Sequence, residues 1–291
     1  MTGQKKAYSY AAAAVLLWST VASAFKISLR YMDYLHLLLF SSLVSTVALF
    51  IIIVMQGKLG LIRNLRRSDY VRFALMGLLN PFAYYVFLFK SYSLLPAQEA
   101  QPLNYTWPVI LSLLSVPLLK QKMKRRSIAG IMISFAGVFI ISTRGNPASF
   151  SFSNPAGALL ALGSAVIWAV YWICNLKDGR DAVVKLFAIF VFGLIYISIY
   201  LSIRTALIMP PAEGLAGAAF VGLFEMGITF IVWIKALELS ENTARVAGLI
   251  YLVPFLSLLL ICLVVGEQIL ASSITGLCFV TGGILVQKTG N

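Results

Sequence analysis

The sequence predicts an all-α integral membrane protein in which ten transmembrane helices form two inverted five-helix repeats. Three observations support this fold class. Of the 291 residues, 60% are hydrophobic and 11% are charged, whereas soluble domains carry about 25% charged residues. The mean hydropathy is +0.91, and apolar runs of membrane-spanning length follow one another along the chain. The second half of the chain also repeats the first at a nearly constant offset.

The apolar runs are each close to the roughly 20 residues that a helix needs to cross a bilayer. Runs of this length exclude an outer-membrane barrel, whose strands are shorter and alternate in polarity. No convincing cleavage site follows the first run, so we expect it to remain as the first helix. The ten runs are residues 8–29, 35–55, 69–90, 97–119, 126–142, 154–174, 184–206, 214–237, 242–265 and 270–287.

The net charge of +13 indicates a membrane orientation rather than a nucleic-acid partner. When the ten spans are drawn with the N-terminus inside, 18 of the 23 Lys and Arg residues lie on the cytoplasmic side. This is the positive-inside bias, and it predicts that both termini are cytoplasmic. The basic residues on the opposite side are Lys26, Arg30, Lys90, Arg144 and Arg204.

An internal repeat relates residues 75–142 to residues 220–287 at an offset of 145, which becomes 146 after one gap. Glycines recur in the last helix of each half, where small residues permit close contact between helices. The matching pairs include Gly77 and Gly222, Lys90 and Lys235, Pro108 and Pro254, Gly130 and Gly276, and Gly137 and Gly283.

The repeat divides the chain into a first five-helix half at residues 1–142, a linker at 143–153 and a second half at 154–291. The linker is rich in turn-forming residues and is predicted to lie outside. An odd number of spans makes the second half enter the membrane from the opposite side. The two halves are therefore predicted to form an inverted repeat, an architecture typical of transporters.

Glu225 is the residue that most needs an explanation, because it lies within an apolar run that extends from Gly222 to Lys235. An acidic residue at the centre of a membrane helix costs about 2.5 to 3.5 kcal/mol, so it usually faces a cavity or a partner. On a continuous helix, Thr229 and Trp233 would share its face. We expect Glu225 to bind the amine of a substrate or to carry a coupling proton. The alternative is a structural hydrogen bond to a neighbouring helix.

Aromatic residues at corresponding positions suggest a shared central site. Trp18 in the first helix matches Trp168 in the sixth at an offset of 150, and Trp172 follows Trp168 on the same helical face. For any one of these aromatic residues, packing or a place in the interfacial belt is the alternative.

Prolines mark two further candidate regions. In the third span Asn80 and Tyr84 share a helical stripe, and the proline after Asn80 can loosen the backbone. In the fourth span, two prolines bend the helix and would aim Tyr105 or Trp107 inward. The complete candidate substrate-binding set is Trp18, Asn80, Tyr84, Tyr105, Trp107, Trp168, Trp172, Glu225 and Thr229.

No catalytic residues, metal ligands or cofactor motif are predicted. Cys174, Cys262 and Cys278 lie in separate predicted spans without a close pair, and His36 is the only histidine. The sequence contains no nucleophile motif and no glycine-rich phosphate loop. A membrane enzyme is therefore the less favoured class.

The helix that contains Pro254 ends in Gly266-Glu267, and the last helix carries Gly276 and Gly283. Together with ten spans in two inverted halves, these residues resemble the EamA-type repeats of the drug/metabolite transporter superfamily, over essentially the whole chain. The segment Asn104-Tyr-Thr-Trp107-Pro108, with Glu99 ahead of it, is similar to aromatic amino acid exporters of that superfamily. The first half departs from the pattern, because Lys120-Gln121 stands where the second half has Gly266-Glu267.

This resemblance implies alternating-access transport of a small metabolite, outward across a bacterial inner membrane. An aromatic-lined cavity with one carboxylate suits an amine-bearing substrate such as an amino acid, a cationic drug or a polyamine. An anionic substrate such as a sugar phosphate or nucleotide sugar is the alternative, and it would require inward-facing Lys or Arg. We expect a monomer whose partners are its substrate and the lipid bilayer, with no cofactor and no nucleic acid.

Overall fold

The computed structural model describes residues 3–120, 125–146, 153–175, 178–241, 246 and 248–289, and this part of the chain is helical without any strand. The all-α prediction is confirmed. The predicted linker lies partly outside the described residues. Shorter apolar helices cover Ile128–Ile141, Leu249–Val265 and Ala271–Val286. In the described part of the chain, six helices are long and apolar enough to cross a membrane: Gly3–Ser28, Tyr34–Met55, Arg67–Leu94, Pro155–Asn175, Ala182–Arg204 and Ala212–Glu238.

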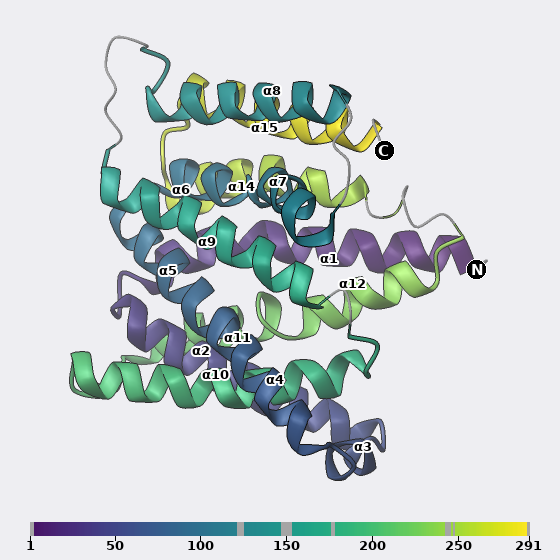
Figure 1. The fold of residues 1–291 in the computed structure, drawn as a ribbon. Helices are drawn as coiled ribbons and strands as arrows, with labels where there is room; N and C mark the ends of the chain where they lie inside the picture. Colours follow the sequence, from purple (N-terminus) through teal and green to yellow (C-terminus); the bar gives the residue numbers. More distant parts are fainter. Residues whose placement is uncertain are drawn as a thin grey trace. The chain divides into compact units, whose positions relative to one another are not determined.

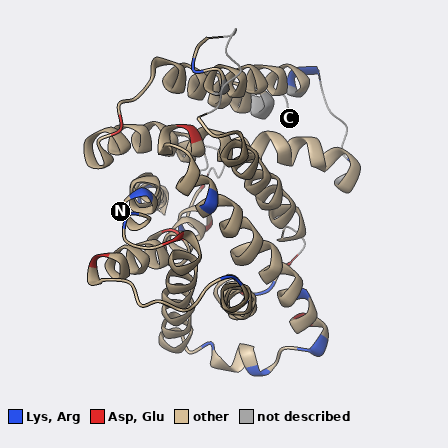
Figure 2. Cartoon of the chain, turned by 90° about the vertical axis from the view of Figure 1, so that its left-hand side faces the viewer, with Lys and Arg blue, Asp and Glu red and all other residues tan. Residues whose placement is uncertain are grey.

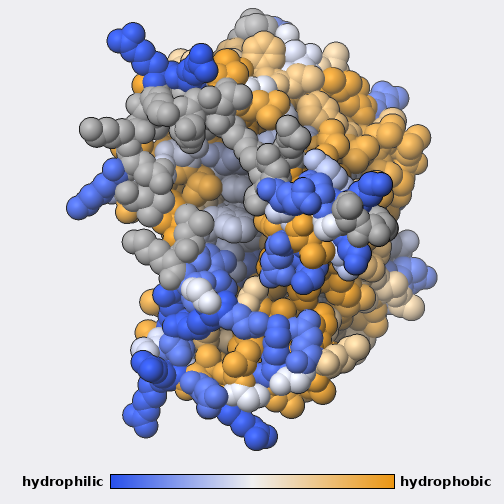
Figure 3. Space-filling view, turned by 90° about the vertical axis from the view of Figure 1, so that its right-hand side faces the viewer, coloured by the Kyte–Doolittle hydropathy of each residue, from blue (hydrophilic) through white to orange (hydrophobic). Residues whose placement is uncertain are grey.

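The surfaces of these helices suit a lipid environment. Charged residues are sparse along the helices (Figure 2), and broad hydrophobic areas cover much of the surface in Figure 3. Ile128, Met132, Phe135 and Phe139 recur every three or four residues and are all exposed. An exposed apolar stripe of this kind places one face of a helix against lipid.

The described chain forms two compact units, and each unit takes helices from both halves of the sequence. The first unit contains residues 1–86 and 179–260, and the second contains residues 87–178 and 261–291. The units therefore do not coincide with the two repeats predicted from the sequence.

In the first unit, α2 packs against α10 and α11, while α1 packs against α11, α12 and α14 (Figure 1). Asp33 and Asp181 cap the N-termini of α2 and α10, respectively, because each carboxylate accepts hydrogen bonds from two backbone N–H groups of the first turn. The elements are α1 (Gly3–Ser28), α2 (Tyr34–Met55), α3 (Leu59–Arg63), α4 (Arg67–Gly77), η1 (Leu78–Ala83), α10 (Ala182–Arg204), α11 (Ala212–Phe224), α12 (Ile228–Glu238), η2 (Leu249–Leu252) and α14 (Val253–Leu260).

In the second unit, α8 and α15 run side by side, as Figure 1 shows. A Cβ atom at Gly137 would lie 2.7 Å from the backbone nitrogen of Val280, and one at Gly283 would lie 2.7 Å from that of Ser134. The predicted close contact through glycines is confirmed. The elements are α6 (Ala97–Asn104), α7 (Trp107–Leu119), α8 (Arg125–Ser142), α9 (Pro155–Asn175), η3 (Ile261–Val265) and α15 (Ala271–Thr289), with α5 (Tyr84–Leu94) shared with the first unit.

Three of the predicted spans are interrupted. The third breaks at Asn80, whose φ of −144° and ψ of 123° are not helical. The fourth breaks between α6 and α7, at Tyr105 and Thr106, just ahead of Trp107 and Pro108. The eighth breaks between Phe224 and Ile228, where Gly227 has φ −121° and ψ −94°. The prediction that Glu225, Thr229 and Trp233 share one helical face is therefore wrong, because that backbone is not continuous.

Candidate functional site

Glu225 lies in the break between α11 and α12, directly after the last residue of α11. Its side chain is half-buried. The hydroxyl group of Tyr85 in α5 donates a hydrogen bond to Oε1 of Glu225 across 3.2 Å. The carboxylate is thus held at an interruption within an apolar helix by a residue from the other half of the sequence.

The break closes through hydrogen bonds to the end of α11. The hydroxyl group of Thr229 donates to the carbonyl oxygen of Phe224 across 2.5 Å. The carbonyl oxygen of Val221 accepts from the backbone nitrogens of Glu225 and Met226, at 2.9 and 3.3 Å. Thr229 is fully buried. Its hydroxyl proton is therefore used by the backbone, which satisfies one of the carbonyls that a helix end leaves free.

Serines of α2 line the same break. The Ser42 hydroxyl lies 3.9 Å from the sulfur of Met226, and the Ser45 hydroxyl lies beside Gly227. The hydroxyl oxygens of Ser41 and Ser45 are buried without a hydrogen-bond partner among the described residues. Reasoning from the sequence missed these serines, because their spacing along a strongly apolar helix does not show which neighbour they face.

Asn80 occupies the position in the first half that Glu225 occupies in the second. The offset of 145 that matches Gly77 with Gly222 also matches Asn80 with Glu225. Asn80 is 3% exposed, and its Oδ1 atom has no hydrogen-bond partner in the described part of the chain. Corresponding helices are therefore both broken at a polar residue. This signal was present in the sequence, but only the backbone shows that both positions are breaks.

The remaining predicted residues of the first unit are aromatic. The ring of Trp18 lies 5.3 Å from that of Phe230 and 5.7 Å from that of Trp233, both in α12. Tyr84 is buried, with its ring 4.6 Å from that of Tyr85. Trp18 thus contacts the helix that follows the break, and Tyr84 contacts the residue that binds Glu225.

The second unit holds the other predicted residues, in a tryptophan cluster of α7 and α9. The rings of Trp107 and Trp172 are nearly parallel, with centroids 6.3 Å apart, and Trp168 meets Trp172 edge-on at 6.1 Å. The indole nitrogen of Trp172 is buried without a hydrogen-bond partner among the residues described. Tyr105 lies in the turn between α6 and α7. The structure brings three of the four predicted residues of this unit together.

A polar network at the start of α6 was not predicted. Glu99 is 2% exposed, and its carboxylate accepts hydrogen bonds from Arg144 at 2.8 and 3.1 Å and from Ser153 at 2.6 Å. Glu267 accepts from the backbone nitrogens of Ala97 and Gln98, at 2.9 and 3.2 Å. Glu267 therefore caps the N-terminus of α6, and Glu99 ties α6 to the linker between the halves.

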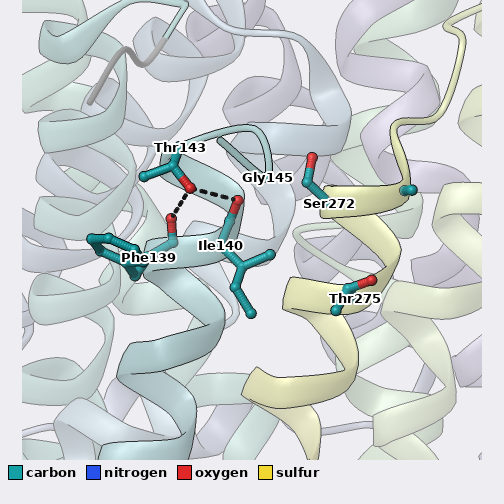
Figure 4. Close-up of a pocket in the computed structure, with 7 residues that line it drawn as sticks. Phe139, Ile140, Thr143, Gly145, Ser272 and Thr275 are labelled. Atoms are coloured by element: carbon teal, nitrogen blue, oxygen red, sulfur yellow. Dashed lines mark hydrogen bonds between the residues drawn. The ribbon is translucent and has the colours of Figure 1, made fainter. Parts of the chain in front are cut away.

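A pocket of about 350 Å³ lies between the end of α8 and the start of α15, and none of the predicted site residues lines it. Figure 4 shows the Thr143 hydroxyl bonded to the carbonyl oxygens of Phe139 and Ile140, with Ser272 and Thr275 on the facing helix. The hydroxyl proton of Thr143 is therefore used by its own helix.

Long apolar helices, interrupted at corresponding places by polar residues, define a membrane transporter. The chain belongs to the EamA-like transporter family, whose model matches residues 5–143 and 155–287. It is therefore a transporter and not an enzyme.

Curated relatives and a solved structure are similar to the chain. An aromatic amino acid exporter, YddG, of Ancylobacter novellus is 27% identical over 62% of this chain and 63% of the exporter, so the match spans less than two thirds of that relative. A probable terminal-alkyne amino-acid exporter of Streptantibioticus cattleyicolor is 26% identical over 87% of this chain and 83% of its own length. A crystal structure at 21% identity shares the fold, with a TM-score of 0.67 over 97% of this chain and 96% of that one.

Proposed function

We propose that the protein is an alternating-access exporter of a small amine-bearing metabolite such as an amino acid. The observation that carries this proposal is the position of Glu225, a carboxylate at the break of an apolar helix with Tyr85 as its hydrogen-bond donor. A carboxylate at membrane depth is costly unless it binds a partner. An ammonium group or a proton would neutralise it.

The aromatic residues support an amine-bearing substrate. Ring faces attract cations, and Trp18 and Tyr84 belong to the same compact unit as Glu225. In this proposal Asn80 and Thr229 belong to the same site. The predicted residues of the second unit, Tyr105, Trp107, Trp168 and Trp172, remain candidate substrate-binding residues. Two relatives are named as amino acid exporters, which agrees with this substrate class.

Competition at Glu225 would drive exchange. A proton or other cation arriving from outside displaces the substrate amine, and its loss inside restores the binding site.

An anionic substrate would instead require a cation in the site. In the described structure Lys58, Arg144 and Arg180 pair with Asp181, Glu99 and Asp69, respectively.

The proposed membrane arrangement follows the sequence. Ten helices form two inverted repeats at residues 1–142 and 154–291, in a monomer of a bacterial inner membrane with both termini cytoplasmic. The two segments matched by the family model, 5–143 and 155–287, support this division. The excess of basic residues on one side supports the orientation.

A ligand screen followed by a transport assay tests the function. Thermal shift of the purified protein against amino acids, polyamines, cationic dyes and sugar phosphates identifies a ligand, because a ligand that binds only the folded state stabilises it. In proteoliposomes, Glu225→Gln is expected to lower transport of that ligand roughly tenfold or more, since a hydrogen bond to a charged group is worth about 1.5 to 3 kcal/mol. Glu238→Gln, at an exposed ion pair with Lys235, is the control. Full transport by Glu225→Gln would leave Glu225 only a structural role.

A further inference from the structure

The α3 segment, residues 55–67, joins two membrane spans. The candidate spans Tyr34–Met55 and Arg67–Leu94 flank it directly, and α3 (Leu59–Arg63) is the helix between them (Figure 1). Gly57 turns the chain after α2 with a φ of +66°, a conformation that favours glycine. So short a connection keeps the segment at the surface of the bilayer.

The protein does not cover the apolar side chains of this segment. No residue of α3 is buried. Leu59 and Leu61 are exposed, and Met55, at the end of α2, is 80% exposed. A single exposed apolar residue needs no explanation. Three of them at one end of a membrane span match the boundary between lipid headgroups and acyl chains, where apolar side chains leave water.

The same segment is strongly basic. It contains no Asp or Glu, and its cations are Lys58, Arg63, Arg66 and Arg67. Among the ion pairs described in the structure, only that of Lys58 with Asp181 involves the segment. The side chains of Arg63 and Arg67 are exposed. The segment therefore presents net positive charge at the surface of the membrane.

We propose that the α3 segment is a binding surface for anionic phospholipids. Leu59 and Leu61 enter the boundary between headgroups and acyl chains, and the arginines bind the lipid phosphates. A guanidinium group can donate two parallel hydrogen bonds to one phosphate. Basic residues beside a membrane span attract anionic headgroups, and each one strengthens the attraction roughly fivefold. In the proposed orientation these lipids belong to the cytoplasmic leaflet.

A phospholipid fits this surface better than a soluble anion does. A soluble anion would need the cations alone, whereas exposed leucines and cations alternate along the α3 segment. The flanking spans also hold both kinds of side chain at the depth where a phospholipid carries its phosphate above its acyl chains. The lipid is a partner of this surface and not the transported substrate, so the inference goes beyond the proposed function.

Lipid binding to the purified full-length protein tests the charges. Native mass spectrometry of the protein in detergent is titrated with phosphatidylglycerol or with phosphatidylcholine. We expect phosphatidylglycerol to bind in preference, and Arg63→Gln/Arg67→Gln to weaken its binding roughly tenfold or more, since two cations are removed. The matched control is Lys5→Gln/Lys6→Gln, which removes two exposed cations at the start of α1 and should change the binding less than about threefold.

Three results of this titration would overturn the proposal. The first is equal binding of the two lipids by the wild-type protein. The second is a loss in the arginine variant no larger than that in the lysine control, which would leave only a general attraction between charges. The third is displacement of phosphatidylglycerol by glycerol phosphate, which would assign the cations to a free phosphate compound.

A spin label measures the depth of α3 independently of these variants. After the three free cysteines are replaced, labels at Leu61→Cys and at Val47→Cys, an exposed position within α2, are compared in vesicles that contain phosphatidylglycerol. We expect both labels to collide more often with oxygen than with a water-soluble nickel complex, because both lie in lipid. A label at position 61 that meets the nickel complex more often than oxygen places α3 in water and contradicts the proposal. Neither measurement involves substrate, so failure here leaves the proposed exporter function standing.

Discussion

The hydroxyl group of Tyr85 donates a hydrogen bond to Glu225 across 3.2 Å and thereby joins two helices at corresponding places in the two halves of the sequence. Tyr85 follows the break at Asn80 by five residues, and Glu225 lies at the equivalent break. The polar contact therefore connects the helix that follows the first break to the second break. Such a contact allows the carboxylate to remain in place when no ligand is bound.

Removal of this hydrogen bond tests its role. Tyr85→Phe keeps the ring but loses the donor to Glu225, so we expect transport to fall about threefold to tenfold, less than in Glu225→Gln. Tyr70→Phe, at an exposed tyrosine outside the candidate site, is the control. The measurement is initial transport rate in proteoliposomes. Equal rates for wild-type protein and Tyr85→Phe would show that Glu225 does not need this donor.

The packing of α8 on α15 gives a matched pair of glycine variants. A Cβ atom at Gly283 would meet the backbone nitrogen of Ser134 at 2.7 Å, whereas one at Gly282 would meet nothing within 4 Å. Gly283→Ala should therefore cost about 1 to 3 kcal/mol of unfolding free energy through overpacking. Gly282→Ala should be neutral or slightly stabilising. Thermal unfolding in detergent measures both, and similar melting temperatures would contradict the close contact.

The ion pair of Arg144 with Glu99 should matter for stability. Glu99 is 2% exposed on its side chain, so Arg144→Ala leaves a buried carboxylate without its main partner. The expected cost is about 3 kcal/mol, at the low end for a broken buried pair because the Arg144 side chain is 43% exposed. Lys235→Ala, in an exposed pair with Glu238, should cost less than about 1 kcal/mol. Adding Glu99→Gln to Arg144→Ala should recover part of the loss, since it removes the unpaired charge.

Asp181 predicts an acid-dependent contribution to stability. Burial raises the pKa of Asp181, but hydrogen bonds from Lys58 and from the backbone nitrogens of Val184 and Val183 outweigh burial and hold the pKa below its ordinary value of 3.8. A carboxyl group whose pKa is lower in the folded than in the unfolded protein stabilises the folded state. This stabilisation is fully present at pH values above the unfolded-state pKa, and it is lost as the pH falls through the folded-state pKa. The melting temperature of Asp181→Asn should therefore lie below that of the wild-type protein near neutral pH, and the gap should close below about pH 4. A gap independent of pH would contradict this assignment.

Cysteine labelling tests the membrane orientation. Cys174, Cys262 and Cys278 are free and exposed, so they are first replaced. An impermeant maleimide should then label Asn146→Cys in intact cells, and it should label Gly60→Cys only after permeabilisation, because the positive-inside bias places the first outside and the second in the cytoplasm. The reverse pattern would invert the proposed topology.

Several features were predictable because they depend on local chemistry. Apolar runs of membrane length predict helices without reference to neighbours, since backbone groups in lipid must be satisfied within the segment. Pro108 predicts an interruption of the fourth span because it lacks an N–H group. The matched glycines at 137 and 283 predict close helix contact because nothing larger than hydrogen lies between the backbones.

The break at Glu225 shows why the remainder was not predictable. No proline marks that span, so the apolar pattern from Gly222 to Lys235 favours one continuous helix, and the expectation that Thr229 shares the face of Glu225 followed from it. The non-helical residue is Gly227, and the Ser45 hydroxyl of α2 lies beside it. The helix propensity of residues 222–235 cannot predict a break in the helix that contacts with a neighbouring helix help to stabilise.

The sequence alone determined that this protein is a helical membrane protein with an internal repeat and one costly carboxylate, because hydropathy, charge placement and repetition are properties of the linear chain. Only the tertiary structure decided that Tyr85 binds Glu225 and that Glu99 pairs with Arg144. Those partners lie 140 and 45 residues apart. Contacts between residues so far apart in the sequence depend on how all the helices pack together. A local pattern of residues does not contain that information.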